Sequence, residues 1–332
     1  MVVSTAFLIP AANAAAGWNP TTNYPKTIEA GSCVVDAATI FCVGGTPNYD
    51  GPAIADANMA PWMANGKVKG PNWVPTTPYH NPIALESCVV SGISASSQFI
   101  YCVGGQAGGT VYAAVWSAPI SAAGIGTWTM ATNSYPMPIF GESCFAYLGY
   151  LICVGGETVG STYVNNVYSA HYINGVVGAW TAQTHYPLTG YALSCVKYFD
   201  YAYCVGGYNG ASTNAVYSAQ LTLNGGITGA GWSVQAHHYL LTVDGESCVV
   251  RGNKIYCVGG YTGGGNTNLV YDAKLVAGTV GAWTNAAPPS ISPYPTTVSE
   301  TECVNATATN HIACVGGVPN GGQPINSVYY YP

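Results

Sequence analysis

The stretch SCVVRGNKIYCVGG, from Ser247 to Gly260, decides the fold because five relatives of it recur along the chain. Each copy carries two cysteines and ends in a glycine doublet, and the doublets return every 51 to 60 residues. A fixed period of this size is typical of supersecondary units stacked side by side. The other copies are SCVVDAATIFCVGG (32–45), SCVVSGISASSQFIYCVGG (87–105), SCFAYLGYLICVGG (143–156), SCVKYFDYAYCVGG (194–207) and ECVNATATNHIACVGG (302–317).

The spacing of the cysteines predicts a disulfide across each hairpin. If Gly252 and Asn253 form a two-residue turn, Cys248 faces Cys257 in a non-hydrogen-bonded pair, where Cα atoms lie about 4.5 Å apart. A disulfide accepts that distance, and free buried cysteines are the alternative. The predicted pairs are Cys33 with Cys42, Cys88 with Cys102, Cys144 with Cys153, Cys195 with Cys204, Cys248 with Cys257, and Cys303 with Cys314.

Further strands follow each glycine doublet. A third strand contains a tyrosine, and a fourth contains a tryptophan. Four short strands per repeat, separated by turn signals, are typical of propeller blades. The first repeat lacks the tyrosine, although it keeps Trp73. The tyrosines are Tyr112, Tyr168, Tyr217, Tyr271 and Tyr329, and the other tryptophans are Trp128, Trp180, Trp232 and Trp283.

This order of apolar strand, Gly-Gly, Tyr and Trp resembles the kelch repeat over residues 17–332. The resemblance implies an all-β fold: one six-bladed β-propeller of four-stranded blades, with the cysteine-bearing strands innermost. A disulfide in every blade is a departure from the general kelch pattern. The last repeat stops before any tryptophan strand, whereas AAGWNPTTNYP (15–25) resembles GAGWSVQAHHY (229–239). We therefore expect Trp18 to complete the sixth blade and close the ring.

Charge is scarce in this chain of 332 residues, with 7 Lys and Arg against 13 Asp and Glu. Arg251 is the only arginine, so the composition argues against nucleic-acid partners and against polybasic attachment to lipid. No apolar run of about 18 residues predicts a membrane span. Six disulfides need an oxidising compartment or a hyperthermophile interior, so we expect an extracellular or cell-surface protein. Its weakly charged surface suits a harsh setting, acid included.

Two sets of residues are candidates for a binding site. A tyrosine follows each tryptophan in the link to the next blade, and six such rings could form a rim that stacks against glycans or another protein. The alternative is that they wedge between blades. Carboxylates near the inner strands, namely Glu86, Glu142, Glu246, Glu300 and Glu302, could gather at the channel mouth. The rim tyrosines are Tyr24, Tyr79, Tyr135, Tyr186, Tyr239 and Tyr294.

The sequence gives little indication of a metal, cofactor, glycosylation or catalytic site. The histidines His80, His171, His185, His237, His238 and His311 show no ligand spacing, so no metal and no cofactor is predicted. Asn305-Ala306-Thr307 is the one glycosylation sequon. A copper radical oxidase resembling galactose oxidase needs a cysteine cross-linked to a tyrosine, and every cysteine already has a hairpin partner. We therefore expect no catalytic residues and no enzyme.

Residues 1–16 belong to no blade, and Val2–Ile9 is apolar. One interpretation is a signal peptide with a small-residue cleavage region at Ala12-Asn13-Ala14. The other is an arm that packs against a neighbouring subunit by strand addition or groove filling. The interpretation as an arm favours a structural protein, a self-assembling subunit of a surface filament or sheath in which residues 1–10 connect one subunit to the next. A secreted lectin or adhesin that uses the tyrosine rim is the alternative function.

Overall fold

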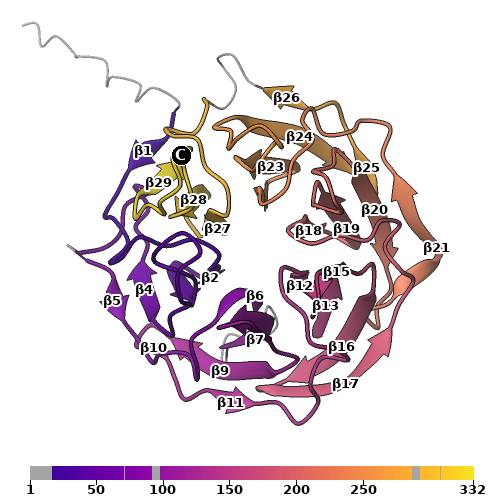
Figure 1. Ribbon diagram of the computed structural model, residues 1–332, viewed down its shortest axis with the longest axis horizontal. Helices are drawn as coiled ribbons and strands as arrows, with labels where there is room; N and C mark the ends of the chain where they lie inside the picture. The colour runs from indigo at the N-terminus through magenta and orange to yellow at the C-terminus, as the bar shows by residue number, and fades with distance from the viewer. Residues whose placement is uncertain (1–16, 71, 92–97, 286–291, 307) are drawn as a thin grey trace, which may run out of the picture.

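The computed structural model describes residues 17–70, 72–91, 98–285, 292–306 and 308–332, which form six antiparallel sheets around a central axis (Figure 1). These residues contain strands and turns but no helix. The predicted all-β, six-bladed propeller is therefore confirmed. The proposed arm, residues 1–16, lies outside the described residues.

Each blade is a meander in which the cysteine hairpin lies innermost. Blade 1 consists of β2 (Ser32–Asp36), β3 (Thr39–Val43), β4 (Ala57–Pro61) and β5 (Val74–Pro75). Blade 2 consists of β6 (Ala84–Val90), β7 (Gln98–Ala107), β9 (Val115–Ser121), β10 (Gly124–Ile125) and β11 (Thr129–Met130). Blade 3 consists of β12 (Ser143–Tyr147), β13 (Tyr150–Val154), β16 (Val167–Ile173) and β17 (Val176–Ala182). Short strands β8 (Thr110–Val111), β14 (Glu157–Thr158) and β15 (Thr162–Tyr163) lie in the loops after the glycine doublets.

Blades 4 to 6 repeat this plan. Blade 4 consists of β18 (Ser194–Tyr198), β19 (Tyr201–Val205), β20 (Val216–Leu221) and β21 (Ile227–Val234). Blade 5 consists of β22 (Ser247–Arg251), β23 (Lys254–Val258), β24 (Val270–Val276), β25 (Thr279–Val280) and β26 (Thr284–Asn285). Blade 6 consists of β27 (Glu302–Ala306), β28 (His311–Val315), β29 (Val328–Tyr331) and β1 (Asn19–Pro20).

The cysteine hairpins have the register expected from their spacing. In blade 5, Arg251 pairs with Lys254 at the turn, which places the two cysteines of β22 and β23 opposite each other. All six predicted disulfides form, with Cα–Cα distances of 4.0 to 4.1 Å. They join Cys33 to Cys42, Cys88 to Cys102, Cys144 to Cys153, Cys195 to Cys204, Cys248 to Cys257, and Cys303 to Cys314. Since all twelve cysteines lie in the described residues and none is free, the alternative of free buried thiols is wrong for this structure.

The third-strand tyrosine is replaced in two blades. In blade 2 the residue opposite the second cysteine is Trp116, because Cys102 pairs with it. Tyr112, which the sequence suggested for this position, instead lies just beyond β8 in the preceding loop. In blade 1 the position opposite Cys42 is taken by Asn58, whose amide donates to the hydroxyl of Tyr24 at 3.0 Å.

The chain ends meet in blade 6, as expected. Strand β1 pairs with β29, aligning Asn19 with Tyr330. Trp18 packs edge-on against Tyr294 at a centroid distance of 5.0 Å and donates its indole N–H to the carbonyl of Ser292. The strand from the start of the chain therefore covers the outer edge that the sixth blade would otherwise expose.

The predicted rim tyrosines are buried, with exposed fractions of 1 to 5%, so they do not form a binding rim. Each ring packs edge-on against the tryptophan of the next blade at 4.8 to 5.0 Å. That tryptophan donates its indole N–H to the carbonyl two residues before the tyrosine. We call this pair the Trp–Tyr latch. The pairs are Tyr24–Trp73, Tyr79–Trp128, Tyr135–Trp180, Tyr186–Trp232, Tyr239–Trp283 and Tyr294–Trp18.

The Ser-Cys dipeptides explain how the inner strands are joined. The backbone N–H of Cys88 donates to the hydroxyl of Ser32 in the preceding blade, and four further blades repeat this bond at 2.9 Å. In the sixth repeat Glu302 replaces the serine, and its carboxylate accepts from the N–H of Cys33. The glutamate thus completes a ring of hydrogen bonds around the channel.

The strands give the ring two distinct ends. We call the end with the glycine doublets and the links between blades the mouth face. The opposite end, with the turns inside the cysteine hairpins and the turns between third and fourth strands, is the hairpin face. At the mouth face, the residue three positions before the first cysteine of each blade has a positive φ. In blades 2 to 6 its backbone N–H donates to the carbonyl of the corresponding residue in the preceding blade, at 2.7 to 2.9 Å. These residues are Ala30, Leu85, Gly141, Ala192, Gly245 and Glu300.

Candidate functional site

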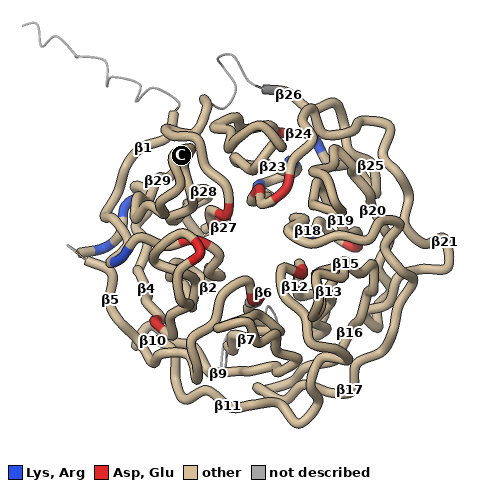
Figure 2. Tube along the Cα trace, in the orientation of Figure 1, with Lys and Arg blue, Asp and Glu red and all other residues tan. Residues whose placement is uncertain are grey.

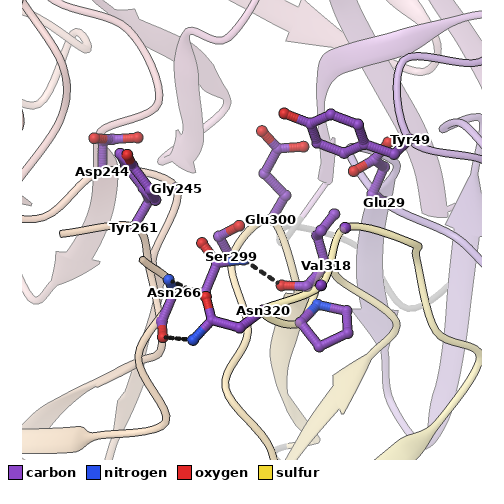
Figure 3. A pocket seen from close by; sticks show the side chains of 13 residues that line it. Glu29, Tyr49, Asp244, Gly245, Tyr261, Asn266, Ser299, Glu300, Val318 and Asn320 are labelled. Carbon is purple, nitrogen blue, oxygen red and sulfur yellow. Dashed lines mark hydrogen bonds between the residues drawn. The ribbon is translucent and has the colours of Figure 1, made fainter. Parts of the chain in front are cut away.

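Two adjoining pockets hollow the mouth face, with volumes of about 360 Å³ and about 580 Å³. Glu29, Tyr49 and Glu300 line both of them. Figure 3 shows Glu300 and Glu29 beside Tyr49, with Asp244 and Tyr261 on the neighbouring blade across the pocket. Carboxylates and phenol rings from different blades therefore converge on this surface.

A short bridge positions these side chains. The residue four before the first cysteine pairs with the residue that follows the glycine doublet of its own blade, as Glu29 does with Thr46 and Asp244 with Tyr261. Sequence reasoning missed Tyr49, Asp244 and Tyr261. Asp244 and Tyr261 could have been identified from the sequence, because each lies at a fixed distance along the chain from a cysteine or a glycine doublet.

The pocket is acidic and disfavours ionisation of its own carboxyls. Burial, followed by the charges of Glu29, Asp244 and Asp50, raises the pKa of Glu300 to about 7. Burial also raises the pKa of Glu29 and of Asp244 above their ordinary values. No basic residue lines either pocket among the described residues. The mouth therefore becomes more negative as the pH rises.

Aromatic rings surround this acidic centre. Tyr49 and Tyr261 are 54% and 40% exposed. Tyr163 stacks on Tyr191 with a centroid distance of 5.6 Å and an interplanar angle of 8°. Exposed phenol rings next to carboxylates can stack against a ligand while the carboxylates accept hydrogen bonds from it. This surface, and not the six predicted rim tyrosines, presents aromatic groups to solvent near the channel.

Beneath the mouth, three glutamates lie inside the ring. Glu86, Glu142 and Glu246 are only 4 to 6% exposed. Each packs against the first glycine of the preceding doublet, where a Cβ would stand 2.5 to 2.9 Å from a carboxylate oxygen. Their oxygens accept no hydrogen bond from another residue among those described, and only the backbone N–H of each glutamate itself favours its ionised form. Burial raises the pKa of Glu142 to about 8, so this side chain is mostly protonated in neutral solution, and burial also raises the pKa values of Glu86 and Glu246 well above 4.5.

Figure 2 shows that most Asp and Glu positions lie around the central opening of the ring. There, Glu86 and Glu142 line a cavity of about 160 Å³ together with Glu300 and Glu302. The predicted gathering of Glu86, Glu142, Glu300 and Glu302 near the mouth is thus present, whereas Glu246 does not line this cavity. Within the described residues, no group of three or more His, Cys, Asp or Glu side chains has the geometry of a metal site.

The other candidates are placed individually. His311 is buried in β28, with burial lowering its pKa, while His80 stacks on Trp116. The side-chain amide of Asn305, the predicted glycosylation atom, donates to the carbonyl of Val250 at 2.7 Å. A glycan there would have to displace this bond. Thr307, which completes the sequon, lies outside the described residues.

No family model matches the chain, and no curated protein matches it. Among solved structures, the chain is similar to the one entitled "Structure of YjhT", with a TM-score of 0.72 and 14% identity. The match covers 92% of this chain and 95% of the other. At this identity the similarity shows the six-bladed fold alone. The kelch resemblance therefore stays a resemblance of sequence pattern.

The described residues include no helix that is long and apolar enough to cross a membrane. Six disulfides are typical of proteins that fold in an oxidising compartment. The covalent structure therefore points to a secreted or extracellular protein.

Proposed function

We propose that this chain is an extracellular, non-catalytic structural propeller that associates with copies of itself, with residues 1–10 as a connector. The observation that carries the proposal is the double reinforcement of the ring. Every blade has a disulfide in its inner hairpin, and every junction has a Trp–Tyr latch. Such a ring suits a load-bearing role outside the cell.

The sulfur pairing supports the non-catalytic part of the proposal. A radical oxidase of the galactose oxidase type would need a cysteine for its cross-link to tyrosine, and all twelve cysteines are bonded to each other. Releasing one would open the inner hairpin of a blade. Copper analysis of the purified protein, together with an oxidase assay, tests this part: stoichiometric copper with turnover would contradict it.

Removing residues 1–10 is expected to leave folded propellers that no longer assemble, because the apolar connector would be lost while the ring stays complete. Negative-stain microscopy and sedimentation measure assembly, and a thermal melt measures folding. A length-matched variant, Phe7→Asp with Leu8→Asp, should act like the truncation, whereas Ser4→Ala should not. Unchanged assembly after truncation would remove the connector from the proposal.

A second candidate function is binding of a polyhydroxylated ligand, such as a glycan, at the mouth. The two pockets with exposed Tyr49 and Tyr261 beside carboxylates favour it. Loss of one stacking ring should weaken binding, so Tyr49→Ala is expected to reduce affinity roughly fivefold to tenfold. A glycan array finds the ligand and calorimetry measures it, with the buried-latch variant Tyr135→Phe as control. A glycan held equally well by Tyr49→Ala would place binding elsewhere.

A further inference from the structure

The charged residues are divided between the two ends of the ring. All of them lie in described segments, and the strand register assigns each to a face. The mouth face holds Glu29, Asp50, Asp56, Glu86, Glu142, Glu157, Asp244, Glu246, Glu300 and Glu302, with Lys26 as its single cation. Burial disfavours ionisation of Glu86, Glu142, Glu246 and Glu302, so the negative charge of the mouth comes chiefly from the other six carboxylates. The hairpin-face half holds Lys67, Lys69, Lys197, Arg251, Lys254 and Lys274, with Asp36, Asp200 and Asp272.

Such a division has a consequence for contacts between copies. Two mouth faces repel one another, and so do two hairpin faces, whereas a mouth face attracts a hairpin face. Within the mouth, Asp50 and Asp244 lie in its loops and line the pockets. Within the hairpin face, Lys197 and Lys274 are exposed near the hairpin-face ends of β18 and β24.

The hairpin face also carries a group of exposed apolar side chains in blades 3 to 5. Their turns adjoin, because the outer turn of blade 4 packs through Gly225 on Tyr150 of blade 3, and Gly278 of blade 5 packs on Tyr201 of blade 4. An exposed group of this kind is typical of a protein contact surface. Its members, 53 to 81% exposed, are Leu148, Ile173, Val176, Phe199, Leu223 and Val276.

The mouth face offers apolar groups to meet this patch. Tyr49, Val159 and Tyr261 are 54%, 65% and 40% exposed and stand on the loops after the glycine doublets. Apolar side chains surrounded by complementary charge are the usual composition of a protein–protein interface. The mouth face of a second copy therefore matches the hairpin face both in charge and in exposed apolar side chains.

The path of the chain leads to the same face. Strand β1 runs antiparallel to β29, so Asn19 is nearer the hairpin face than Pro20. Trp18 therefore enters blade 6 from the hairpin-face end. The described residues therefore start at the hairpin-face end of blade 6, which in a stack would meet the mouth face of the next copy.

From the charge division, the apolar patch and the chain entry, we infer that copies of this chain stack head to tail along the propeller axis, with the mouth face of one copy on the hairpin face of the next. This inference rests on the proposed self-association and names its surface. The contact is heterologous and does not close on itself unless the stack curves into a ring, so it builds an open filament. Stacking also covers the mouth and excludes a ligand there.

A charge-swap experiment tests the stacking. The first variant, Lys197→Glu with Lys274→Glu, makes the hairpin face acidic. The second, Asp50→Lys with Asp244→Lys, cancels most of the negative charge of the mouth and places two lysines beside its pockets. Each variant alone should need a protein concentration roughly tenfold or more above that of the unmodified chain to assemble at pH 7.5 and low salt. An equimolar mixture should regain assembly, because the acidic mouth of the first variant meets the basic hairpin face of the second, and the introduced lysines of the second meet the introduced glutamates of the first. Filaments should alternate the two variants.

The control adds the same charge elsewhere. Thr129→Glu, Thr181→Glu, Ala182→Glu and Ser233→Glu lie on exposed outer-strand positions and match the net change of the first variant; this protein should assemble normally. Melting temperatures verify that every variant folds. If both swapped variants assemble alone as readily as the unmodified chain, stacking is wrong while self-association stands. If the unmodified chain and the mixture both stay monomeric, the proposed self-association itself is wrong.

Discussion

A chain that begins at residue 25 is expected to lose most of its folding stability. The deletion of residues 17–24 removes β1 from blade 6, and with it the latches Tyr294–Trp18 and Tyr24–Trp73. Truncating one large buried aromatic costs about 3–5 kcal/mol, so two lost latches amount to roughly 6–10 kcal/mol. Domains are stable by only about 5–15 kcal/mol. Thermal melting and urea titration measure the loss.

The matched control begins at residue 17 and retains both latches. It should melt close to the full-length protein, because residues 17–332 contain the complete ring. The single change Trp18→Phe should lie between the two, since it keeps a ring against Tyr294 but loses the indole N–H that bonds Ser292. An unchanged melting temperature for the chain that begins at residue 25 would show that β1 does not hold the ring closed.

The protein is expected to be most stable in acid and to weaken as the pH rises toward 8. Burial raises the pKa of Glu142 and Glu302 to about 8 and of Glu300 to about 7 from an ordinary 4.5, and Glu86 and Glu246 are raised as well. A carboxyl with a raised folded-state pKa takes up a proton on folding. Its contribution to stability is complete below about pH 4.5 and is lost as the pH rises through 7 to 8.

The size of this effect is large because every resolved carboxyl shift has the same sign. One pKa unit corresponds to about 1.4 kcal/mol, so Glu142 and Glu302, whose pKa values reach about 8, each contribute a few kcal/mol to the difference between pH 4 and pH 8. Denaturant titrations across this range measure it. Stability that is flat or rises with pH would contradict the burial of neutral carboxyls in the channel.

The variant Glu142→Gln isolates one of these groups. Glutamine resembles the protonated acid in size and carries no charge, so the variant should match the unmodified protein near pH 4 and exceed it near pH 8. Asp200→Asn, at a hairpin turn on the opposite face, is the control and should leave the pH profile unchanged. A protein with this expected pH profile would be suited to an acidic extracellular setting, which the composition also suggests.

The inner hairpins could be predicted to the residue from the sequence. Register in a two-residue hairpin is set locally by the turn, so Cys248 and Cys257 had to meet once Gly252 and Asn253 formed it. Trp18 could be placed in blade 6 because its segment repeats the pattern of blade 4. Tyr112 was assigned wrongly because TVYAAVWSA contains two aromatic residues, and only the pairing of β7 with β9 distinguishes them.

The candidate site was predicted only in part, because its members come from different blades. The pattern of one repeat shows that a tyrosine follows each tryptophan, but exposure depends on what the next blade places over it, and a tryptophan covers each ring. Similarly, Glu86 is buried because Gly44 in the neighbouring blade leaves room for its carboxylate. Periodicity within one chain does not reveal such contacts between repeats.

By itself, the sequence determined the number of blades, the disulfide pairing and the closure of the ring, because each depends on spacing along the chain. Only the tertiary structure decided which tyrosines face solvent, which glutamates are kept neutral, and that acidic residues gather at one end of the ring and basic residues at the other. Those properties depend on the distances between side chains of neighbouring blades, and desolvation and charge act through space rather than along the backbone.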